Sequence, residues 1–289
     1  MVASEPHMAQ DTSLKGRTML ITGANTGIGL ATAEVLAARG ARVWLGCRSE
    51  ERARPILERL RASGGNVELL SIDLADLASV RAAAGRFLAT GEPLHVLINN
   101  AGLAGKRDLT RQGFELAFGT NHLGPFLLTT LLLDRLRASA PARIVTVSSR
   151  AHYRVKHLDW DALRKPASTV AAMPEYSVSK LCNVLFTREL ARRLEGSGVT
   201  TYSLHPGVIA SDIWREVPSL LRPLLKLFMR SNEEGARTSL KCATAPELAS
   251  STGRYYDENG VEREPSRLAR DEALAAELWS RSEAWVREA

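Results

Sequence analysis

The sequence predicts an α/β protein with a doubly wound, mostly parallel sheet of about seven strands, flanked by helices in a single domain. Short apolar runs alternate with helix-like stretches along most of the chain. Each apolar run is nearly continuous, as in parallel strands that are buried on both faces. No Pro-, Gly- or Ser-rich linker and no internal repeat divides the 289 residues, so we expect one domain.

Seven apolar runs are the strand candidates. In chain order they read "TMLITGA", "ARVWLGCR", "NVELLSIDL", "HVLINNAG", "ARIVTVSS", "VTTYSLHPG" and "GRYYDENG", of which the last is the least regular. Because helical stretches separate most of them, successive strands are expected to run parallel.

Helical patterns fill the segments between these runs. They cover residues 28–39, 50–63, 76–89, 111–138, 175–196 and 232–244. Gly40, Gly64 and Gly198 fall just past three of the expected helix ends, where a C-terminal cap needs a positive φ angle. This order of strand, helix and strand is typical of a doubly wound sheet.

The sequence shows neither a secretory signal nor an apolar run long enough to cross a bilayer, so we expect a protein of the cytoplasm. Residues 1–14 are expected to be a flexible tail, because "MVASEPHMAQDTS" lacks the basic and then apolar pattern of a secretory signal. Residues 15–289 are expected to form the single catalytic domain. The longest apolar stretch, "GPFLLTTLLLD", is far shorter than the ~20 residues needed to cross a bilayer, so we expect no transmembrane span.

Charge and cysteine usage exclude several function classes. The net charge is +6, but the basic residues are interleaved with acidic ones on helix-like stretches, which argues against nucleic-acid binding. Cys47, Cys182 and Cys242 form no C-x-x-C pair, which suits a reducing compartment. His152 and His157 have no carboxylate or cysteine partner at metal spacing, so no metal site is expected.

The stretch "TGANTGIG" follows the first apolar run and precedes the first helix. A glycine-rich turn between a strand and a helix is the context of a dinucleotide-binding loop. Gly23 is expected to allow a sharp turn, while Gly27 and Gly29 let the helix N-terminus approach a pyrophosphate. A plain tight turn is the alternative.

Arg48 favours NADP(H) over NAD(H). An acid about 20 residues past such a loop binds the ribose 2′-hydroxyl of NAD, whereas an arginine accommodates the 2′-phosphate of NADP. Here the second strand ends in "GCRSEE", with Arg48 at its tip and no acid. Arg52, one turn into the next helix, is placed to assist. The alternative is that Arg48 is a solvated loop residue.

Tyr176 and Lys180 lie four residues apart on an expected helix, so their side chains are neighbours on one face. Lowering the pKa of a tyrosine from ~10 by ~3 units corresponds to ~4 kcal/mol. One positive charge ~4 Å away at an effective dielectric constant of ~20 supplies about that much. The pair is therefore chemically sufficient for acid–base work, although any Y-x-x-x-K on a helix would have this geometry.

Two further polar residues stand near the expected carboxyl edge of the sheet. Ser149 ends the fifth strand candidate, where ligands bind in open α/β sheets, and could hydrogen-bond a substrate carbonyl. The alternative is that Ser148 and Ser149 only cap or turn the chain. Asn121 interrupts an apolar helix and needs buried partners, either as a structural bridge or as a residue that holds water in a relay.

These motifs together resemble the short-chain dehydrogenase/reductase family. The matching stretches are "TGANTGIG", "NNAG" at 99–102, Asn121, "VSS" at 147–149, "YSVSK" at 176–180 and "HPG" at 205–207, in the family's order. The resemblance covers roughly residues 17–260 and implies a Rossmann fold. It also implies a catalytic tetrad of Asn121, Ser149, Tyr176 and Lys180, with Ser149 rather than Ser148 at the family's serine position.

The resemblance implies a cofactor site for NADP(H) as well. Asp73 with Leu74 is expected to border the adenine, and Ile209 to meet the nicotinamide amide. The full set of implied cofactor-binding residues is Gly23, Asn25, Thr26, Gly27, Ile28, Gly29, Arg48, Asp73, Leu74, Asn99, Ala101, Gly102, Tyr176, Lys180, Pro206, Gly207 and Ile209.

A mechanism follows from the same resemblance. NADPH delivers hydride to a carbonyl carbon while Ser149 polarises the oxygen and Tyr176 donates the proton. Lys180 lowers the pKa of the tyrosine and holds the nicotinamide ribose, and Asn121 keeps a water that restores the proton. Oxidation of an alcohol runs the same steps backwards.

Longer strings such as "TNHLGPFLLTTLLLDRL" resemble the retinol dehydrogenase subgroup, which acts on lipophilic aldehydes and alcohols with NADP(H). Many of its members carry an N-terminal membrane anchor, which we do not expect in this chain. The alternatives are the same chemistry on a steroid, polyketide or xenobiotic carbonyl, reduction of a tetrapyrrole C=C bond, or a non-catalytic module that senses NADP(H). Residues 150–175 form the variable segment that shapes the substrate pocket in this family. The substrate of the subgroup therefore cannot be assigned to this chain from the resemblance.

A substrate loop is expected at about 208–231. Its segment "PSLLRPLLKLFMR" (218–230) has apolar residues on one helical face and basic residues on another. This pattern fits a lid that touches a membrane surface, or a helix packed on the core or on a partner subunit. The resemblance also implies a homodimer or homotetramer, formed through the helices that carry Asn121 and Tyr176.

Overall fold

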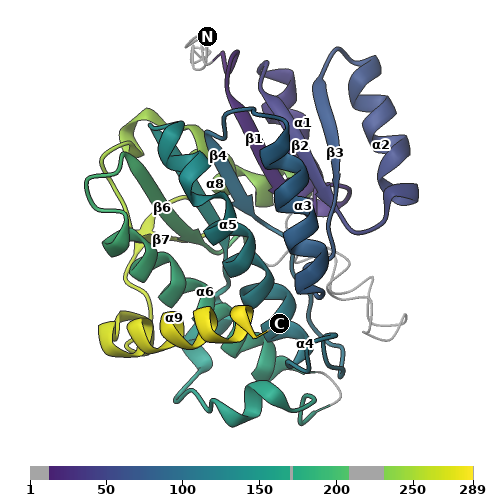
Figure 1. The fold of residues 1–289 in the computed structure, drawn as a ribbon. Coiled ribbons are helices and arrows are strands. Elements are labelled where there is room, and N and C mark those ends of the chain that lie inside the picture. Colours follow the sequence, from purple (N-terminus) through teal and green to yellow (C-terminus); the bar gives the residue numbers. More distant parts are fainter. Residues whose placement is uncertain (1–12, 170–171, 208–230, 289) are drawn as a thin grey trace, which may run out of the picture.

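The computed structural model describes residues 13–169, 172–207 and 231–288. They form one eight-stranded sheet with helices on both faces (Figure 1). The strands lie in the order β3-β2-β1-β4-β5-β6-β7-β8, and every pair is parallel except β7 with β8. Their bounds are β1 Thr18–Thr22, β2 Arg42–Cys47, β3 Asn66–Ser71, β4 Val96–Asn99, β5 Ala142–Val147, β6 Val199–Leu204, β7 Arg254–Tyr256 and β8 Glu262–Arg263.

The helices cover the two faces of the sheet as separate layers. Apolar side chains of α1, α2 and α8 pack in one core layer, and those of α3, α5, α6 and α9 pack in the other. Figure 1 shows α3, α5 and α9 in front of the sheet. The bounds are α1 Gly27–Ala38, α2 Glu50–Ala62, α3 Leu77–Ala89, α5 Gly124–Ala138, α6 Met173–Arg193, α8 Asn232–Thr244 and α9 Glu272–Arg287.

The seven expected strands are all present, and the fold class predicted from the sequence is confirmed. Gly40 and Gly64 have φ angles of 88° and 83°, as a helix C-terminal cap requires. The two-residue strand β8 and the helix α9 were not anticipated. The expected tail, residues 1–14, lies outside the described residues as far as residue 12.

The helix expected over 111–138 is different in its first part. Residues 109 and 115 form an isolated antiparallel bridge, and the helix begins only with α4, Leu116–Phe118. A π-helical segment, η1 (Gly119–Leu123), then connects α4 to α5. A β-carbon on Gly119 would lie 2.3 Å from Cγ2 of Thr110, so the helix here is fitted closely against the preceding loop.

One helical stretch, Leu116–Ala138, is long and apolar enough to cross a membrane by length and composition alone. It is longer than the apolar run from which no span was expected. Within the fold, however, 83% of its most apolar window is buried, which is the behaviour of a core helix.

The C-terminal helix α9 packs against α6. The ring of Trp279 lies 5.0 Å from that of Phe126 on α5 and 5.9 Å from that of Phe186 on α6. The sequence implied subunit association through the helices that carry Asn121 and Tyr176. The face of those helices beneath α9 is covered within the chain itself.

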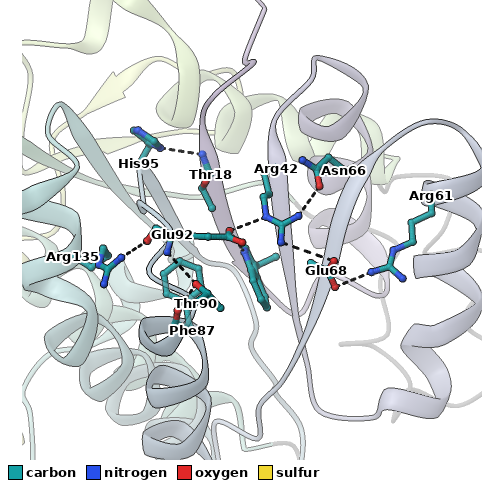
Figure 2. A network of polar contacts seen from close by, with 11 residues as sticks. Thr18, Arg42, Arg61, Asn66, Glu68, Phe87, Thr90, Glu92, His95 and Arg135 are labelled. Atoms are coloured by element: carbon teal, nitrogen blue, oxygen red, sulfur yellow. Dashed lines mark hydrogen bonds and ion pairs between the residues drawn. The ribbon is translucent and has the colours of Figure 1, made fainter.

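A polar network closes the amino-terminal edge of the sheet (Figure 2). Nε of Arg42 donates to the Glu92 carboxylate at 2.7 Å, which also accepts from Nε1 of Trp44 at 2.9 Å. Arg42 further contacts Asn66 and Glu68 at the start of β3. The pKa of Glu92 is lowered, first by its hydrogen bond with Arg42, so this edge favours the charged carboxylate.

Candidate active site

The residues singled out from the sequence gather at the opposite, carboxyl-terminal edge. The loop after β1 carries the glycines, the loop after β4 carries "NNAG", and Ser149 follows β5. The first two turns of α6 carry Tyr176 and Lys180. Loops at the carboxyl ends of parallel strands form the ligand crevice of open α/β sheets, so the topology places these groups where a ligand binds.

The loop after β1 leaves the first turn of α1 open. Gly27 has a φ angle of 58°, which a residue with a β-carbon rarely adopts, and the N-cap Thr26 makes no side-chain cap. The first N–H groups of α1 therefore have no intrahelical partner and no side-chain cap. Such groups, at the positive end of a helix dipole, fit a phosphate. The intermediate exposure of Asn25 and Ile28 and the full exposure of Thr26 leave this turn accessible.

At position 29, the structure requires glycine for a different reason from the predicted one. A β-carbon at this position would lie 2.2 Å from the carbonyl oxygen of Gly23 and 2.5 Å from Nδ2 of Asn100. Gly29 is also buried. Its missing side chain lets α1 fold back onto its own loop, so Gly29 shapes the cradle by internal packing rather than by direct approach to a pyrophosphate.

Thr22 and Asn100 hold the glycine loop against the loop after β4. Oγ1 of Thr22 accepts hydrogen bonds from the backbone N–H groups of Asn100 at 3.0 Å and Ala101 at 3.1 Å. Nδ2 of Asn100 donates to the Thr22 carbonyl at 2.8 Å. Both residues stand inside the motifs recognised in the sequence, but no role was assigned to them, because only the folded chain brings the two loops together.

Ser148 and Ser149 have separate tasks. Ser148 is buried, and its hydroxyl donates to the backbone carbonyl of Lys180 at 2.7 Å. Ser149 is partly exposed, caps the short helix η2 (Arg150–Arg154) and hydrogen-bonds the Tyr176 side chain. Only Ser149 is therefore placed to meet a substrate, as the resemblance implied.

Lys180 lies close to Tyr176, but burial is the first influence on the pKa of the phenol. Nζ of Lys180 is 5.6 Å from the centre of the Tyr176 ring and donates to the Val147 carbonyl at 2.9 Å. Burial raises the pKa of Tyr176, and the hydrogen bond with Ser149 opposes that rise. Burial also lowers the pKa of Lys180 to about 8. Burial is therefore the main influence on the Tyr176 pKa in this structure, and a lowering of that pKa by Lys180 stays a prediction.

Asn121 lies in the π-helical segment with its whole amide engaged. Nδ2 donates to the Leu103 carbonyl at 2.9 Å and to Oγ of Ser179 at 2.9 Å, and Oδ1 accepts from the Leu103 N–H at 2.8 Å. These contacts support the structural bridge, since the side chain ties the loop after β4 to α6. The two predicted roles are not exclusive, and the holding of a water in a relay stays a prediction. π-Helical turns of this kind are frequent at functional sites.

Gly102, the glycine of "NNAG", lies close to both Asn121 and Lys180. A β-carbon on Gly102 would lie 3.3 Å from both Oδ1 of Asn121 and Nζ of Lys180. Gly102 is exposed and Ala101 is partly exposed, so the backbone of this loop is open to a ligand beside the lysine. The structure thus brings together the loop after β4, the π-helical turn and α6.

Two implied cofactor residues face the core instead. Asn99 is only 2% exposed, and its Nδ2 donates to Thr129 on α5 at 2.9 Å, so its side chain braces the end of β4 rather than lining a cleft. Leu74 is buried in the core layer beside α3 and α5. Its neighbour Asp73 is partly exposed, and its carboxylate accepts from the Ala75 N–H at 3.0 Å.

Arg48 is exposed at the end of β2 and makes no hydrogen bond or ion pair with any described residue. Ser49, directly after it, caps α2 through the N–H of Arg52. Pro206 is buried, and Gly207 is partly exposed with a φ angle of 98°. Ile209 and positions 208–230 of the expected substrate loop lie outside the described residues.

The site can hold a dinucleotide and move a proton. The uncapped turn of α1 and the guanidinium of Arg48, which has no partner among the described residues, suit phosphates, and the backbone at Gly102 is open beside Lys180. In the described ranges, no group of three or more His, Cys, Asp or Glu side chains could hold a metal ion.

Comparison with known proteins agrees with this geometry. A sequence model of the family described as short chain dehydrogenase matches residues 17–159. Dehydrogenase/reductase SDR family member 13 of Bos taurus is 48% identical over 278 residues, which cover 93% of this chain and 73% of the relative. Retinol dehydrogenase 12 of Mus musculus is 46% identical over 274 residues, covering 92% of this chain and 85% of the relative.

Solved structures show the same fold. An uncharacterised protein from Mycobacterium Paratuberculosis superposes with a TM-score of 0.77 at 36% identity and covers 95% of both chains. A protein from Beutenbergia cavernae, assigned as an NAD(P)-dependent gluconate 5-dehydrogenase, has NADP bound at low occupancy. It superposes with a TM-score of 0.70 at 25% identity and covers 87% of this chain and 98% of its own.

These relatives match nearly the full length of the chain, and the solved structures share its fold. The chain therefore belongs to the short-chain dehydrogenase/reductase family, in its retinol dehydrogenase-like subgroup, and is a nicotinamide-dependent oxidoreductase that acts on CH–OH and C=O groups.

Proposed function

We propose that the protein transfers hydride between NADP(H) and a lipophilic aldehyde, ketone or alcohol of the retinal and retinol type. The observation that carries this proposal is the convergence of Ser149, Tyr176 and Lys180 beside the open backbone of Gly102. The uncapped turn of α1, where a dinucleotide phosphate fits, lies at the same edge of the sheet.

Tyr176, Ser149 and Lys180 each contribute to the transfer of a proton to the substrate oxygen. Because burial raises the pKa of Tyr176, its phenol keeps a proton at neutral pH and has it available for a substrate oxygen. The Ser149 hydroxyl, hydrogen-bonded to that phenol, orients the same oxygen. Lys180, with a pKa of about 8, offers positive charge near the phenolate that remains after transfer. A bound nicotinamide supplies the hydride.

Arg48 supports the preference for NADP(H). Its guanidinium has no partner among the described residues, and strand β2 ends without an acid at its tip. A free arginine at this place can bind a 2′-phosphate in a bidentate manner, whereas the hydroxyl of NAD(H) offers it no charge. The NADP bound to the solved relative from Beutenbergia cavernae is consistent with this choice.

The names of the similar curated proteins support the substrate class. Retinol dehydrogenase 12 of Mus musculus and retinol dehydrogenase 11 of Homo sapiens are 46% and 45% identical to the chain. A homodimer or homotetramer remains part of the proposal, with a contact surface other than the face of α5 and α6 that α9 covers.

The proposal is tested with a carbonyl panel. Loss of reduced cofactor is followed by its absorbance with NADPH and NADH side by side, and the panel includes retinal, long-chain aldehydes, steroid ketones and polar carbonyls. We expect turnover of lipophilic aldehydes with NADPH. Turnover of steroid ketones alone would show that the substrate is a steroid carbonyl and not a retinal-type aldehyde. Tight NADPH binding without any turnover would favour a non-catalytic NADP(H) sensor.

Arg48 gives a sharper test of the cofactor. In Arg48→Ala, we expect NADPH affinity to fall by about tenfold to a hundredfold, since a charge-assisted hydrogen bond contributes roughly 1.5–3 kcal/mol. NADH affinity should stay the same. Arg52→Ala, one helical turn away, is the matched control and should have a smaller effect. Equal loss of NADH and NADPH affinity in Arg48→Ala would contradict the assignment.

A further inference from the structure

His152 is a fully buried histidine on the short helix η2, three residues after Ser149. The tetrad does not include it. Its ring centre lies 4.1 Å from that of Tyr153 on the same helix and 4.9 Å from that of Tyr255 on β7. The ring therefore joins the segment after β5 to the last parallel strand of the sheet, close to the serine of the tetrad.

Each ring nitrogen of His152 has one backbone partner. Nδ1 lies 2.6 Å from the carbonyl oxygen of Ser149, and Nε2 lies 3.2 Å from the backbone nitrogen of Ser266. A carbonyl oxygen can only accept a hydrogen bond, and a backbone N–H can only donate one. The two partners therefore place the proton on Nδ1 and leave Nε2 as an unprotonated acceptor.

A protonated ring does not fit this arrangement. Protonation would turn Nε2 into a donor that faces the N–H donor of Ser266. Burial lowers the pKa of His152 from its ordinary value of 6.5, and the hydrogen bond with Ser149 opposes that effect only in part. The neutral ring is therefore the form that keeps both backbone partners.

The titratable groups around the ring are neutral or paired. Loss of solvent raises the pKa of both phenols, Tyr153 and Tyr255, and the Tyr153 hydroxyl donates to the Glu264 carbonyl at 2.5 Å. The charged side chains near the two phenols form three ion pairs, which are Arg150 with Glu258, Arg263 with Asp257, and Arg270 with Glu264. These surroundings suit a neutral imidazole.

The ring of His152 holds Ser149 in a way that the other bonds of this serine do not. The Ser149 carbonyl also accepts from the backbone N–H of His152 at 3.2 Å, and Oγ of Ser149 accepts from the Ala151 N–H at 3.2 Å. Those two bonds lie within η2 and its cap. The ring, by contrast, ties Ser149 to Ser266, more than a hundred residues further along the chain.

The segment at Ser266 is itself connected to the catalytic helix. Ser266 lies between β8 and the short helix η6 (Leu268–Arg270), and η6 packs against α6. Helix α6 carries Tyr176. His152 therefore connects Ser149 to a part of the fold that rests on the helix of the proton donor.

We propose that His152, as the neutral tautomer with its proton on Nδ1, is a positioning residue that fixes the backbone of Ser149 to the segment at Ser266. The Nδ1–H group donates to the Ser149 carbonyl, and Nε2 accepts from the Ser266 N–H. Together the two bonds set where the Ser149 hydroxyl lies in the site. The inference rests on the proposed function for its kinetic consequence, whereas the tautomer is a property of the folded chain alone.

The first experiment determines the tautomer by NMR of the wild type, with nitrogen-15 in its six histidines. Correlations between the carbon-bound ring protons and the ring nitrogens distinguish a protonated nitrogen from an unprotonated one. The signals that disappear in His152→Asn identify this residue. We expect a proton on Nδ1 and none on Nε2 at about pH 7.5. A proton on Nε2 would overturn the proposal.

The second experiment separates hydrogen bonding from packing in the turnover of the best panel substrate. His152→Asn keeps an N–H donor near the place of Nδ1 but loses the ring. His152→Phe keeps a ring against Tyr153 and Tyr255 but loses both hydrogen bonds. We expect His152→Asn to keep kcat within about threefold of the wild type, and His152→Phe to lower kcat by about tenfold with little change in the KM for NADPH.

The opposite order, or equal losses in both variants, would show that the ring acts by packing and would overturn the positioning role. His152→Leu, which also lacks both hydrogen bonds, takes the place of His152→Phe if that variant does not fold. His157→Asn is the matched control, because His157 is exposed on the same segment, and its kcat should equal that of the wild type. If the wild type turns over nothing, the proposed function fails, while the NMR experiment still tests the tautomer of His152.

Discussion

The two edges of the sheet treat charge in opposite ways. At the amino edge, Arg42 and Glu92 hold each other, and their hydrogen bond raises the pKa of the arginine and lowers that of the acid (Figure 2). At the carboxyl edge, burial lowers the pKa of Lys180 and raises that of Tyr176. The first edge stabilises charged groups, whereas burial at the second favours the neutral forms of both side chains, and such perturbed pKa values are typical of a reacting site.

Removing the phenol should have the largest effect at the carboxyl edge. In Tyr176→Phe, we expect kcat to fall by about 10²–10⁴-fold, because the proton donor is gone. Cofactor affinity, measured by fluorescence titration, should remain within about threefold, since the packing of the ring is preserved. Near-normal turnover would show that the proton comes from another group and that the comparison of the two edges is misplaced.

Ser148 and Ser149, directly after β5, allow a catalytic role and a structural role to be compared at neighbouring positions. Ser149→Ala should lower kcat by about tenfold to a hundredfold, because the hydroxyl that touches Tyr176 is lost. Ser148→Ala should instead lower the free energy of unfolding by about 1 kcal/mol, through the lost bond to the Lys180 carbonyl. Steady-state kinetics and thermal denaturation on both variants separate these roles. A larger kinetic loss in Ser148→Ala would reverse the assignment.

The amino edge should show the smallest effect, and only in stability. Glu92→Gln removes the charge that Arg42 and Trp44 share, at a partly exposed site. We expect a loss of about 1 kcal/mol in the free energy of unfolding, with kcat and KM unchanged. Urea denaturation together with the NADPH assay measures both. A change in kcat would mean that this network communicates with the catalytic edge.

The sequence was sufficient for the parts that follow from local pattern. Apolar runs located all seven expected strands, because a strand is continuous in the chain. The order of motifs predicted the tetrad, and the assignment of Ser149 rather than Ser148 stays a prediction that the burial of Ser148 supports.

The parts that were missed depend on contacts between distant residues. The π-helical turn at Asn121 is fitted against Thr110. The backbone of Leu74 packs closely against Gly124, where an added β-carbon would lie 2.4 Å from the Leu74 carbonyl oxygen. Spacing shows the charge of Lys180 but not the burial around the Tyr176 phenol, which raises the pKa of that group. Helix α9 corresponds to the amphipathic stretch "DEALAAELWSRSEAWV", which carries no functional motif and was not predicted as a helix.

Helix α9 also determines how far the chain can be shortened. Trp279 packs between the rings of α5 and α6, and Oγ of Ser282 lies 3.2 Å from Nε2 of His122, the residue after Asn121. A truncation that removes Trp279 and Ser282 would take this support away from the elements that carry the catalytic side chains. Such a truncation is expected to lower both stability and turnover.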